Sequence, residues 1–152
     1  MQSNTTASSN TGVGYNALNT NTTGTFCTAV GRAALNSNTT ASDNTAVGFE
    51  ALDANTTGSE NVAVGSAALD ANTTGNYNVA VGKNVLTTAT GATGNTGIGW
   101  RSLEDATGGY NTAVGYSAGL NISTGGFNTA IGTGALDVLK SRAFYEEGAV
   151  GS

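Results

Sequence analysis

The chain repeats one pattern of apolar and polar residues eight times. Each copy reads approximately Gly-aromatic-Asn-Thr-Ala-Val-Gly-x-x-Ala-Leu-x-x-Asn-Thr-Thr, and the glycine after Val marks its position. Six of the seven intervals between marker glycines are 17 residues long and one is 16. A fixed period of about 20 residues indicates supersecondary units that stack on one another. The marker glycines are Gly14, Gly31, Gly48, Gly65, Gly82, Gly99, Gly115 and Gly132.

Each copy contains a short stretch in which β-branched residues alternate with a small residue. Alternation with period two predicts a strand over Asn-Thr-Ala-Val. We expect both β-branched rows to face the core. The first row is Thr11, Thr28, Thr45, Val62, Val79, Thr96, Thr112 and Thr129. The second row is Val13, Val30, Val47, Val64, Val81, Ile98, Val114 and Ile131.

A second apolar pair of Ala-Leu type follows the marker glycine and predicts the opposite wall. One copy cannot fold alone, because burying three or four side chains gives roughly 5 to 8 kcal/mol. Ordering its backbone costs on the order of 20 kcal/mol. Gly and Asn at this density also disfavour helices. We therefore predict an all-β fold, a parallel β-solenoid (β-roll) of about eight 17-residue coils.

The row between the two β-branched rows never exceeds a methyl group, yet alternation points it away from the expected core. We interpret it as an interface in a homotrimer, with a cramped corner of the same coil as the alternative. The proposed interface residues are Ala29, Ala46, Ala63, Ala80, Ala113 and Ala130. The asparagine before each strand predicts a ladder of side-chain amides between coils. Cys27 replaces this asparagine in the second copy, and we expect a half-buried thiol there.

The repeats divide the chain into three parts. Residues 1–9 form a polar N-terminal segment, residues 10–136 carry the solenoid, and residues 137–152 form a C-terminal cap and tail. Leu136, Leu139, Ala143 and Phe144 fall at helical spacing, which predicts a short amphipathic helix over the open end, with the start of a coiled-coil stalk as the alternative. The interval from Gly99 to Gly115 is one residue short, and we expect local bulging there.

Composition excludes several classes of function. Only 10% of residues are charged, and five scattered basic residues give no stripe for binding nucleic acid. No apolar stretch approaches the roughly 18 residues of a membrane span. The start, MQSNTTASSN, has neither the basic nor the apolar region of a signal peptide.

The sequence also lacks the usual residues of catalysis. It contains no histidine, and its acidic residues occupy turn positions that other copies fill with Ser or Asn. General acid-base catalysis usually needs histidine or paired carboxylates in a pocket. We therefore expect no enzyme activity, no cofactor and no metal ion.

The phrases NTAVGYSAG, NVAVGSAAL and NTAVGFEAL resemble the repeats in the heads of trimeric autotransporter adhesins. They are still more similar to the Asn-Thr-Ala-Val-Gly repeats of phage tail fibres and related surface fibres. The resemblance covers residues 10–136 and implies a parallel β-roll assembled as a homotrimer. It also implies a stiff shaft on a virion or an extracellular surface, able to contact a host glycan or protein receptor.

Two hypotheses about binding follow from the outward positions. Aromatic residues after the marker glycines are candidates for receptor contact, with ordinary exposure or packing between chains as the alternative; they are Tyr15, Phe49, Trp100 and Tyr116. The alternative function is an ice-binding solenoid that uses the Asn-Thr-Thr runs. Adjacent threonines point to opposite sides of a strand, so only one of each pair would face ice.

Overall fold

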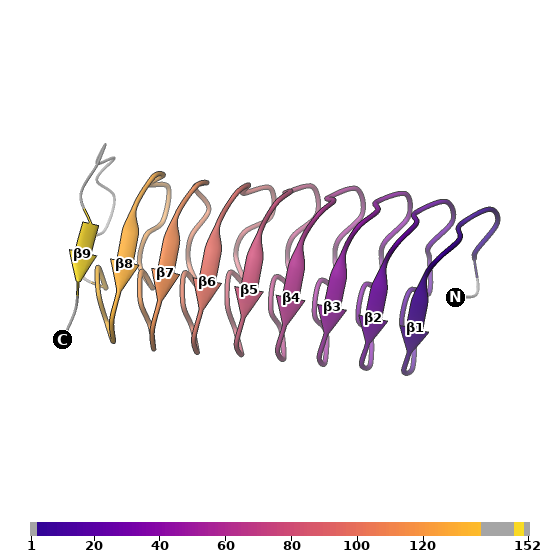
Figure 1. Ribbon diagram of the computed structural model, residues 1–152, viewed down its shortest axis with the longest axis horizontal. Helices are drawn as coiled ribbons and strands as arrows, with labels where there is room; N and C mark the ends of the chain where they lie inside the picture. The colour runs from indigo at the N-terminus through magenta and orange to yellow at the C-terminus, as the bar shows by residue number, and fades with distance from the viewer. Residues whose placement is uncertain (1–2, 138–147, 151–152) are drawn as a thin grey trace.

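The computed structural model of the protein describes residues 3–137 and 148–150. It confirms the parallel β-solenoid: nine short strands form one sheet in chain order, and all neighbouring strands are parallel (Figure 1). The described residues contain no helix. The strands are β1 (Thr11–Val13), β2 (Thr28–Val30), β3 (Thr45–Val47), β4 (Val62–Val64), β5 (Val79–Val81), β6 (Thr96–Ile98), β7 (Thr112–Val114), β8 (Thr129–Ile131) and β9 (Gly148–Val150).

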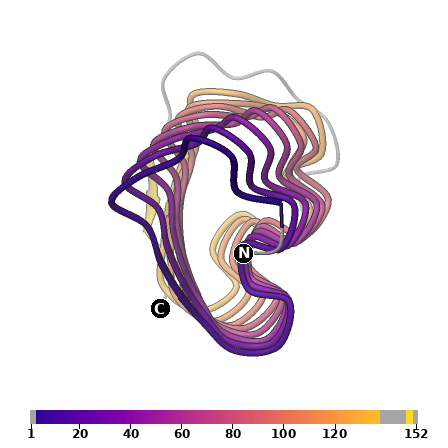
Figure 2. The ribbon, with the colours of Figure 1, turned by 90° about the vertical axis from the view of Figure 1, so that its right-hand side faces the viewer.

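Each inner strand, from β2 to β8, is hydrogen-bonded to the coil before it and the coil after it. In β2, the N–H of Thr28 donates to the carbonyl of Asn44 at 2.9 Å, and the carbonyl of Val13 accepts from Gly31 at 2.8 Å. Viewed along the rod, the coils share one shape, and each is slightly displaced from the coil before it (Figure 2). Equivalent residues therefore stack in rows that run along the rod.

The core contains one large side chain per complete coil. A leucine four residues after each of the first six marker glycines is fully buried and sits at a positive φ of 50° to 56°. This left-handed backbone turns the leucine inward, and its burial offsets a conformational cost of about 1 kcal/mol. These residues are Leu18, Leu35, Leu52, Leu69, Leu86 and Leu103.

The small residues of the strands pack against these leucines, which corrects the prediction that they point outward. The six alanines are completely buried within a single chain, so they cannot contact a second copy. Their burial agrees with the alternative that this row belongs to the chain's own coil. The corrected residues are Ala29, Ala46, Ala63, Ala80, Ala113 and Ala130.

One exchange between coils shows why this row stays small. Gly97 replaces alanine in β6, and Val85 replaces the usual alanine of the facing wall in the preceding coil. A Cβ at Gly97 would lie 2.5 Å from a methyl carbon of Val85, which is closer than real side-chain contacts. At this pair of positions the narrow core holds a larger residue on one wall because the other wall lacks a methyl group.

The two β-branched rows face outward, which reverses the expected orientation. Val13, Val64, Ile98 and Ile131 are 57%, 36%, 39% and 45% exposed. The sequence is apolar on both sides of the strand, and the prediction placed the larger residues in the core. The coil is too narrow to hold these residues beside the leucines, so side-chain size decides which side of the strand faces inward.

The marker glycines allow the coils to approach closely at the end of each strand. Gly82 has a φ of 135°, and a Cβ on it would lie 2.7 Å from the carbonyl oxygen of Gly99 in the next coil. Both the backbone conformation and the space exclude a side chain. This requirement explains the glycine in every copy.

Two ladders of buried asparagines connect the coils, and the predicted ladder before the strands is confirmed. Asn44 Oδ1 accepts the backbone N–H of Asn61 at 2.9 Å, and Asn61 repeats this contact with Asn78 at 3.0 Å. A second ladder at the Asn-Thr-Thr corner comprises Asn21, Asn38, Asn55 and Asn72. Both rows satisfy buried polar groups that water cannot reach.

The missing residue between Gly99 and Gly115 is absorbed at a corner, and the strands stay in register. The hydrogen bond from Asn95 to the corner carbonyl of Gly108 spans 13 residues, whereas that from Asn78 to Ala92 spans 14. Strands β6 and β7 pair residue for residue. Parallel pairing is thus insensitive to the length of the corner.

The predicted C-terminal helix falls largely on residues 138–147, which lie outside the described residues. Residues 148–150, inside the predicted cap, form strand β9 instead. β9 pairs with β8 in the register Ala130↔Ala149. The phrase Gly-Ala-Val-Gly at 148–151 is a ninth copy of the strand motif that the 17-residue spacing did not reveal.

The exchange between Val85 and Gly97 can be tested by a double-mutant cycle. Gly97→Ala should destabilise the fold by about 1–3 kcal/mol through overpacking, and Val85→Ala by about 2 kcal/mol through a cavity. The double variant recreates the Ala-Ala pair of other coils and should lie within about 1 kcal/mol of wild type. Urea unfolding measures all three variants. Additive losses would show that the two positions do not share space.

The interrupted ladder at Cys27 offers a second test. Cys27 is 1% exposed, not half-buried as expected, and its Sγ lies 3.5 Å from the carbonyl oxygen of Ala41. In Cys27→Asn, the amide can donate to that carbonyl as Asn44 donates to Gly58 at 2.8 Å. We expect a gain of about 1 kcal/mol, measured by chemical unfolding. Cys27→Ala supplies no amide and should show no gain.

Candidate interaction surface

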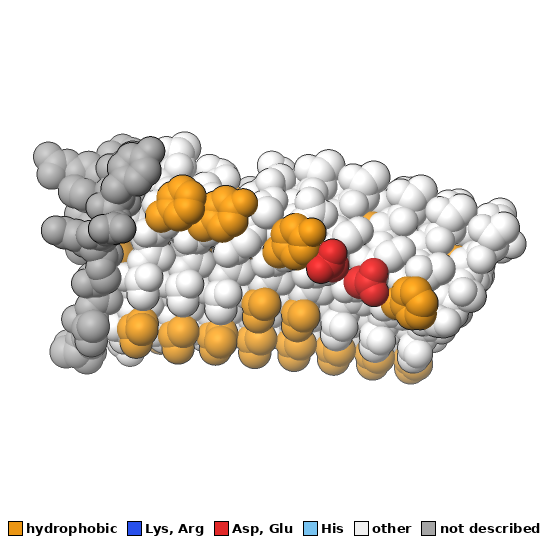
Figure 3. All heavy atoms as spheres, turned by 45° about the horizontal axis from the view of Figure 1, so that its top comes forward, with side chains coloured by type: hydrophobic (Ala, Val, Ile, Leu, Met, Phe, Trp, Pro, Cys, Tyr) orange, Lys and Arg blue, Asp and Glu red, His pale blue; other side chains and the backbone are white. Residues whose placement is uncertain are grey.

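The outward side of strands β1–β8 is a flat face without charged side chains. We call it the strand face; it consists of the Thr/Val row and the Val/Ile row. Figure 3 shows hydrophobic side chains running along it for the length of the solenoid. Strand alternation places these residues outward because the intervening alanines are committed to the core. The result is an unusually apolar surface on a chain of low charge.

A row of mostly exposed residues flanks the strand face on each side, and these two rows differ from coil to coil. We call the row before the strands the acidic border: Ser9, Phe26, Asp43, Glu60, Tyr77, Gly94, Tyr110 and Phe127. We call the row after the marker glycines the basic border: Tyr15, Arg32, Phe49, Ser66, Lys83, Trp100, Tyr116 and Thr133.

The basic border combines cations with aromatic rings. Of the chain's basic residues, the described ones are Arg32 and Lys83 in this row and Arg101 beside it. The Arg32 guanidinium lies 5.1 Å from the centre of the Phe49 ring and 3.3 Å from a carboxylate oxygen of Glu50. Arg101 lies 5.5 Å from the Trp100 ring centre. The border therefore places cations beside aromatic rings, and two of these cations are paired with carboxylates, Arg32 with Glu50 and Arg101 with Glu104.

The four residues predicted for receptor contact all lie on the basic border and are exposed. Tyr15, Phe49, Trp100 and Tyr116 are 71%, 45%, 39% and 52% exposed. Only Trp100 and Tyr116 are brought together, with ring centres 4.8 Å apart and planes tilted by 48°. The four residues form a row and not a single site.

Sequence analysis missed the aromatic residues of the acidic border. Tyr110 and Phe127 stack with ring centres 5.1 Å apart and planes 9° from parallel. The Tyr110 ring also covers Gly94, where an added Cβ would lie 2.7 Å from the ring. The signal was the aromatic position before Asn in GYNTAVG and GFNTAIG. The two borders thus each present a pair of contacting rings near the same end of the solenoid.

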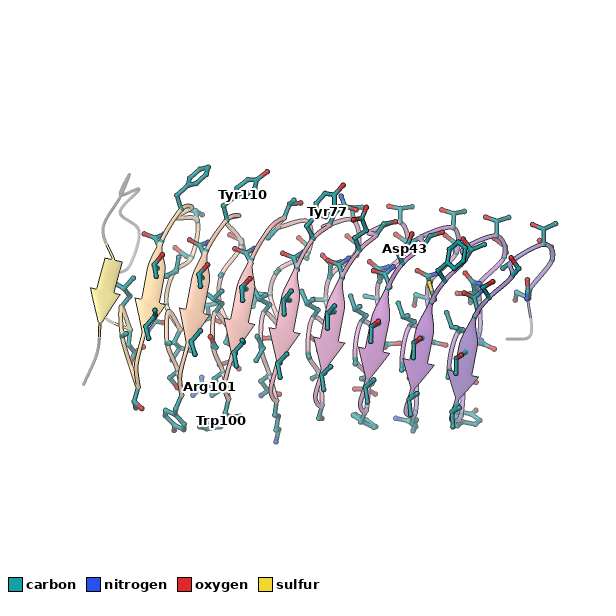
Figure 4. All side chains as sticks on the ribbon, in the orientation of Figure 1. Asp43, Tyr77, Trp100, Arg101 and Tyr110 are labelled. Carbon is teal, nitrogen blue, oxygen red and sulfur yellow. The ribbon has the colours of Figure 1, made fainter. Side chains whose placement is uncertain are left out.

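The strands slant relative to the rod axis, which shifts the two borders against each other. In Figure 1 each strand advances towards the next coil as it runs from the acidic to the basic border. Figure 4 places Trp100 and Tyr110 at nearly the same level along the rod, although Tyr110 belongs to the following copy of the repeat. An acidic-border residue therefore lies level with the basic-border residue of the preceding coil.

The Asn-Thr-Thr corners form a separate polar surface. The first threonine of each pair bonds to the next coil; for example, the Thr39 hydroxyl donates to the carbonyl of Thr56 at 3.1 Å. The second threonine of each pair is exposed, as alternation predicts. The exposed residues are Thr23, Thr40, Thr57 and Thr74.

Cys27 is a free, buried thiol. No cluster of three or more His, Cys, Asp or Glu side chains suited to a metal ion occurs among these residues. Burial raises the pKa of the Cys27 thiol, which keeps it protonated and poorly nucleophilic. Among the residues described, no helix could cross a membrane.

Comparisons with known protein families, with curated proteins and with solved structures found no match to this chain.

A row of acids away from the strand face gives a prediction about stability. Burial raises the pKa of Asp70, and the charges of Glu50 and Asp53 add to the effect. A raised folded-state pKa means that the stabilising form is the protonated one, so its contribution is lost as pH rises above the unfolded value of about 3.9. Asp70→Asn, which copies Asn36 of another coil, should therefore raise the melting temperature at pH 7.

The gain from Asp70→Asn should shrink as the pH is lowered towards 4. Thermal melts across this pH range measure it. The control is Asp105→Asn, which removes the same charge from an exposed side chain. An equal gain in both variants, or a gain independent of pH, would show that general charge and not the burial of Asp70 is responsible.

Proposed function

We propose that the protein is a structural shaft segment of a surface fibre, and that it works as a homotrimer whose strand faces turn towards a common axis. The observation that carries the proposal is the uncharged, β-branched outer side of strands β1–β8. The resemblance of the repeats to those of tail fibres and trimeric adhesins supports the same assignment. The proposed location is accordingly a virion or an extracellular surface.

The chemistry of the strand face favours a covered surface. Parallel sheets are almost always covered on both faces, and here only the inner face is covered by the chain itself. Valine and isoleucine on the outer face gain about 25 cal/mol for each Å² of apolar surface removed from water. A second copy of the chain presents an equally uncharged strand face, so contact between two strand faces desolvates no charge.

The size of the strand face with its borders fits a stable interface. Four outward positions per coil span about 20 Å, and eight strands span about 38 Å along the rod. Each copy therefore offers roughly 760 Å², close to the 800 Å² per partner of a standard interface. Three flat faces around one axis enclose the apolar rows completely, which favours a closed ring over an open edge.

The internal bonding of the solenoid suits a stiff rod. Every coil is tied to the next by strand hydrogen bonds, asparagine ladders and threonine hydroxyls. Local opening must break several of these at once, which makes bending and fraying unfavourable. Contact of Tyr15, Phe49, Trp100 and Tyr116 with a host glycan or protein receptor stays a prediction.

A charge placed in the middle of the strand face should separate the copies without unfolding them. Val64 lies in the central strand β4 and is 36% exposed, so lysine fits there in a single chain. In the assembly its ammonium would be buried without a partner, which is strongly unfavourable. We expect wild type to sediment as a trimer and Val64→Lys as a monomer with an unchanged β-type circular dichroism spectrum.

The control is Thr57→Lys, which adds the same charge at an exposed corner away from the strand face. It should remain trimeric. A wild-type protein that sediments as a monomer would contradict the proposal and favour the ice-binding alternative, in which a regular Thr surface faces solvent. Thermal hysteresis of the purified protein then tests that alternative directly.

A further inference from the structure

We propose that the two borders of the strand face form the contact between neighbouring copies and fix their register along the rod. This inference rests on the proposed trimer and names the residues that would meet in it. When copies are arranged in parallel around a common axis, the basic border of one copy lies next to the acidic border of its neighbour. The two borders then meet along the whole rod.

The strand face alone cannot set this register. Its rows repeat nearly the same residues in every coil, so a slip of one coil, about 4.8 Å, preserves most of the contacts. Only rows that change from coil to coil distinguish one register from another. The two borders are those rows.

The slant of the strands selects which border residues meet. In a closed ring the copies lie at the same height, so each basic-border residue faces the acidic-border residue of the following coil, as for Trp100 and Tyr110 (Figure 4). This rule brings Arg32 of one copy opposite Asp43 of the next. It brings Tyr15 opposite Phe26, and Lys83 opposite Gly94. No like charges meet.

The last three coils provide the strongest contact. Trp100 and Tyr116 touch within one copy, and Tyr110 and Phe127 stack within one copy. At equal height, Trp100 faces the neighbour's Tyr110, and Tyr116 faces the neighbour's Phe127. Two prearranged ring pairs would thus combine into a cluster of four, and aromatic residues of this kind dominate interface energetics.

The same arrangement accounts for the exposure of large side chains on an otherwise small-residue chain. Eight aromatic side chains of the borders are exposed in the single chain, by 39% to 71%. The contact between borders covers both rows. These residues are Tyr15, Phe26, Phe49, Tyr77, Trp100, Tyr110, Tyr116 and Phe127.

Disulfide crosslinking tests the register directly. In a Cys27→Ala background, the double variant Arg32→Cys with Asp43→Cys places two thiols opposite each other across every contact between copies. Oxidation should give covalent trimers on non-reducing gels, because each chain bonds to both neighbours. Disulfides require Cα atoms about 4.4–6.8 Å apart, so the crosslink reports the register to within one coil.

The matched control is Arg32→Cys with Glu60→Cys, which is one coil out of register and should give at least tenfold less covalent trimer. Each single variant should give none, because its thiols do not meet in a parallel ring. Crosslinking of the out-of-register pair as efficiently as the matched pair would overturn the inference. So would absence of crosslinking by the matched pair in a protein that sediments as a trimer, whereas a monomeric wild type would refute the proposed function itself.

Trp100, the single tryptophan of the chain, gives an independent readout. In the assembly its ring should be shielded by the neighbour's Tyr110, so acrylamide should quench its fluorescence several-fold less than in monomeric Val64→Lys. Tyr110→Ala should restore quenching in a protein that remains trimeric. Equal quenching in wild type and Val64→Lys would show that Trp100 does not lie at the contact.

Discussion

The structure depends on one constraint: a coil closed in about 17 residues encloses space for only one large side chain. Leucine fills that space in almost every copy, and the other buried members of the core cluster are alanines together with Cys27, Val85 and Ile122. Packing at the density of protein interiors then fixes the rest of the coil. The pair Val85 and Gly97 obeys the same rule, since one wall gains methyl groups where the other loses one. The seventh coil keeps its volume in a similar way, because Gly119 replaces leucine and Ile122 replaces the corner asparagine.

A core this narrow brings buried backbone groups, which need hydrogen-bond partners, close to every side chain. The asparagine ladders supply those partners. Each amide bonds both to the next coil and to a corner carbonyl, so polar groups remain satisfied without water. Where the corner row changes to Ala89, Ala106 and Ile122, the amides disappear together and apolar packing takes over. A continuous ladder of this kind is stable. Loss of a single member is destabilising, because the neighbouring amides lose a hydrogen-bond partner.

Much of this architecture could be predicted from the period and alternation of the sequence. The eight strands β1–β8 lie where Thr-Ala-Val alternation placed them, and the asparagine ladder before them is present. The predicted orientation of the strands was wrong, because alternation divides the residues of a strand between two faces and both faces are apolar. Side-chain volume distinguishes the two faces: the residues that are always small, such as Ala46 and Ala63, lie inside. Strand β9 was missed because an unrelated stretch of sequence separates it from β8 and disrupts the spacing.

The candidate surface was only partly visible in sequence for the same reason. Tyr15, Phe49, Trp100 and Tyr116 were identified by their variability, but the facing border could not be recognised while the strand face was assigned to the core. Which residues of the two borders lie level with each other depends on the slant of the strands, a property of the folded coil. Sequence repeats therefore reveal rows, and the structure is needed to show how one row lies beside another.

A solenoid of near-identical coils separates two tasks that most folds combine. Residues that repeat unchanged, such as the leucines and asparagines, stabilise the coil and are indifferent to which coil they occupy. Information about position along the rod can reside only in residues that differ between coils, and in the described chain these concentrate on the outward borders and corners. A change there alters little of the internal packing. Specific contacts with a partner can thus vary along the rod without loss of the fold.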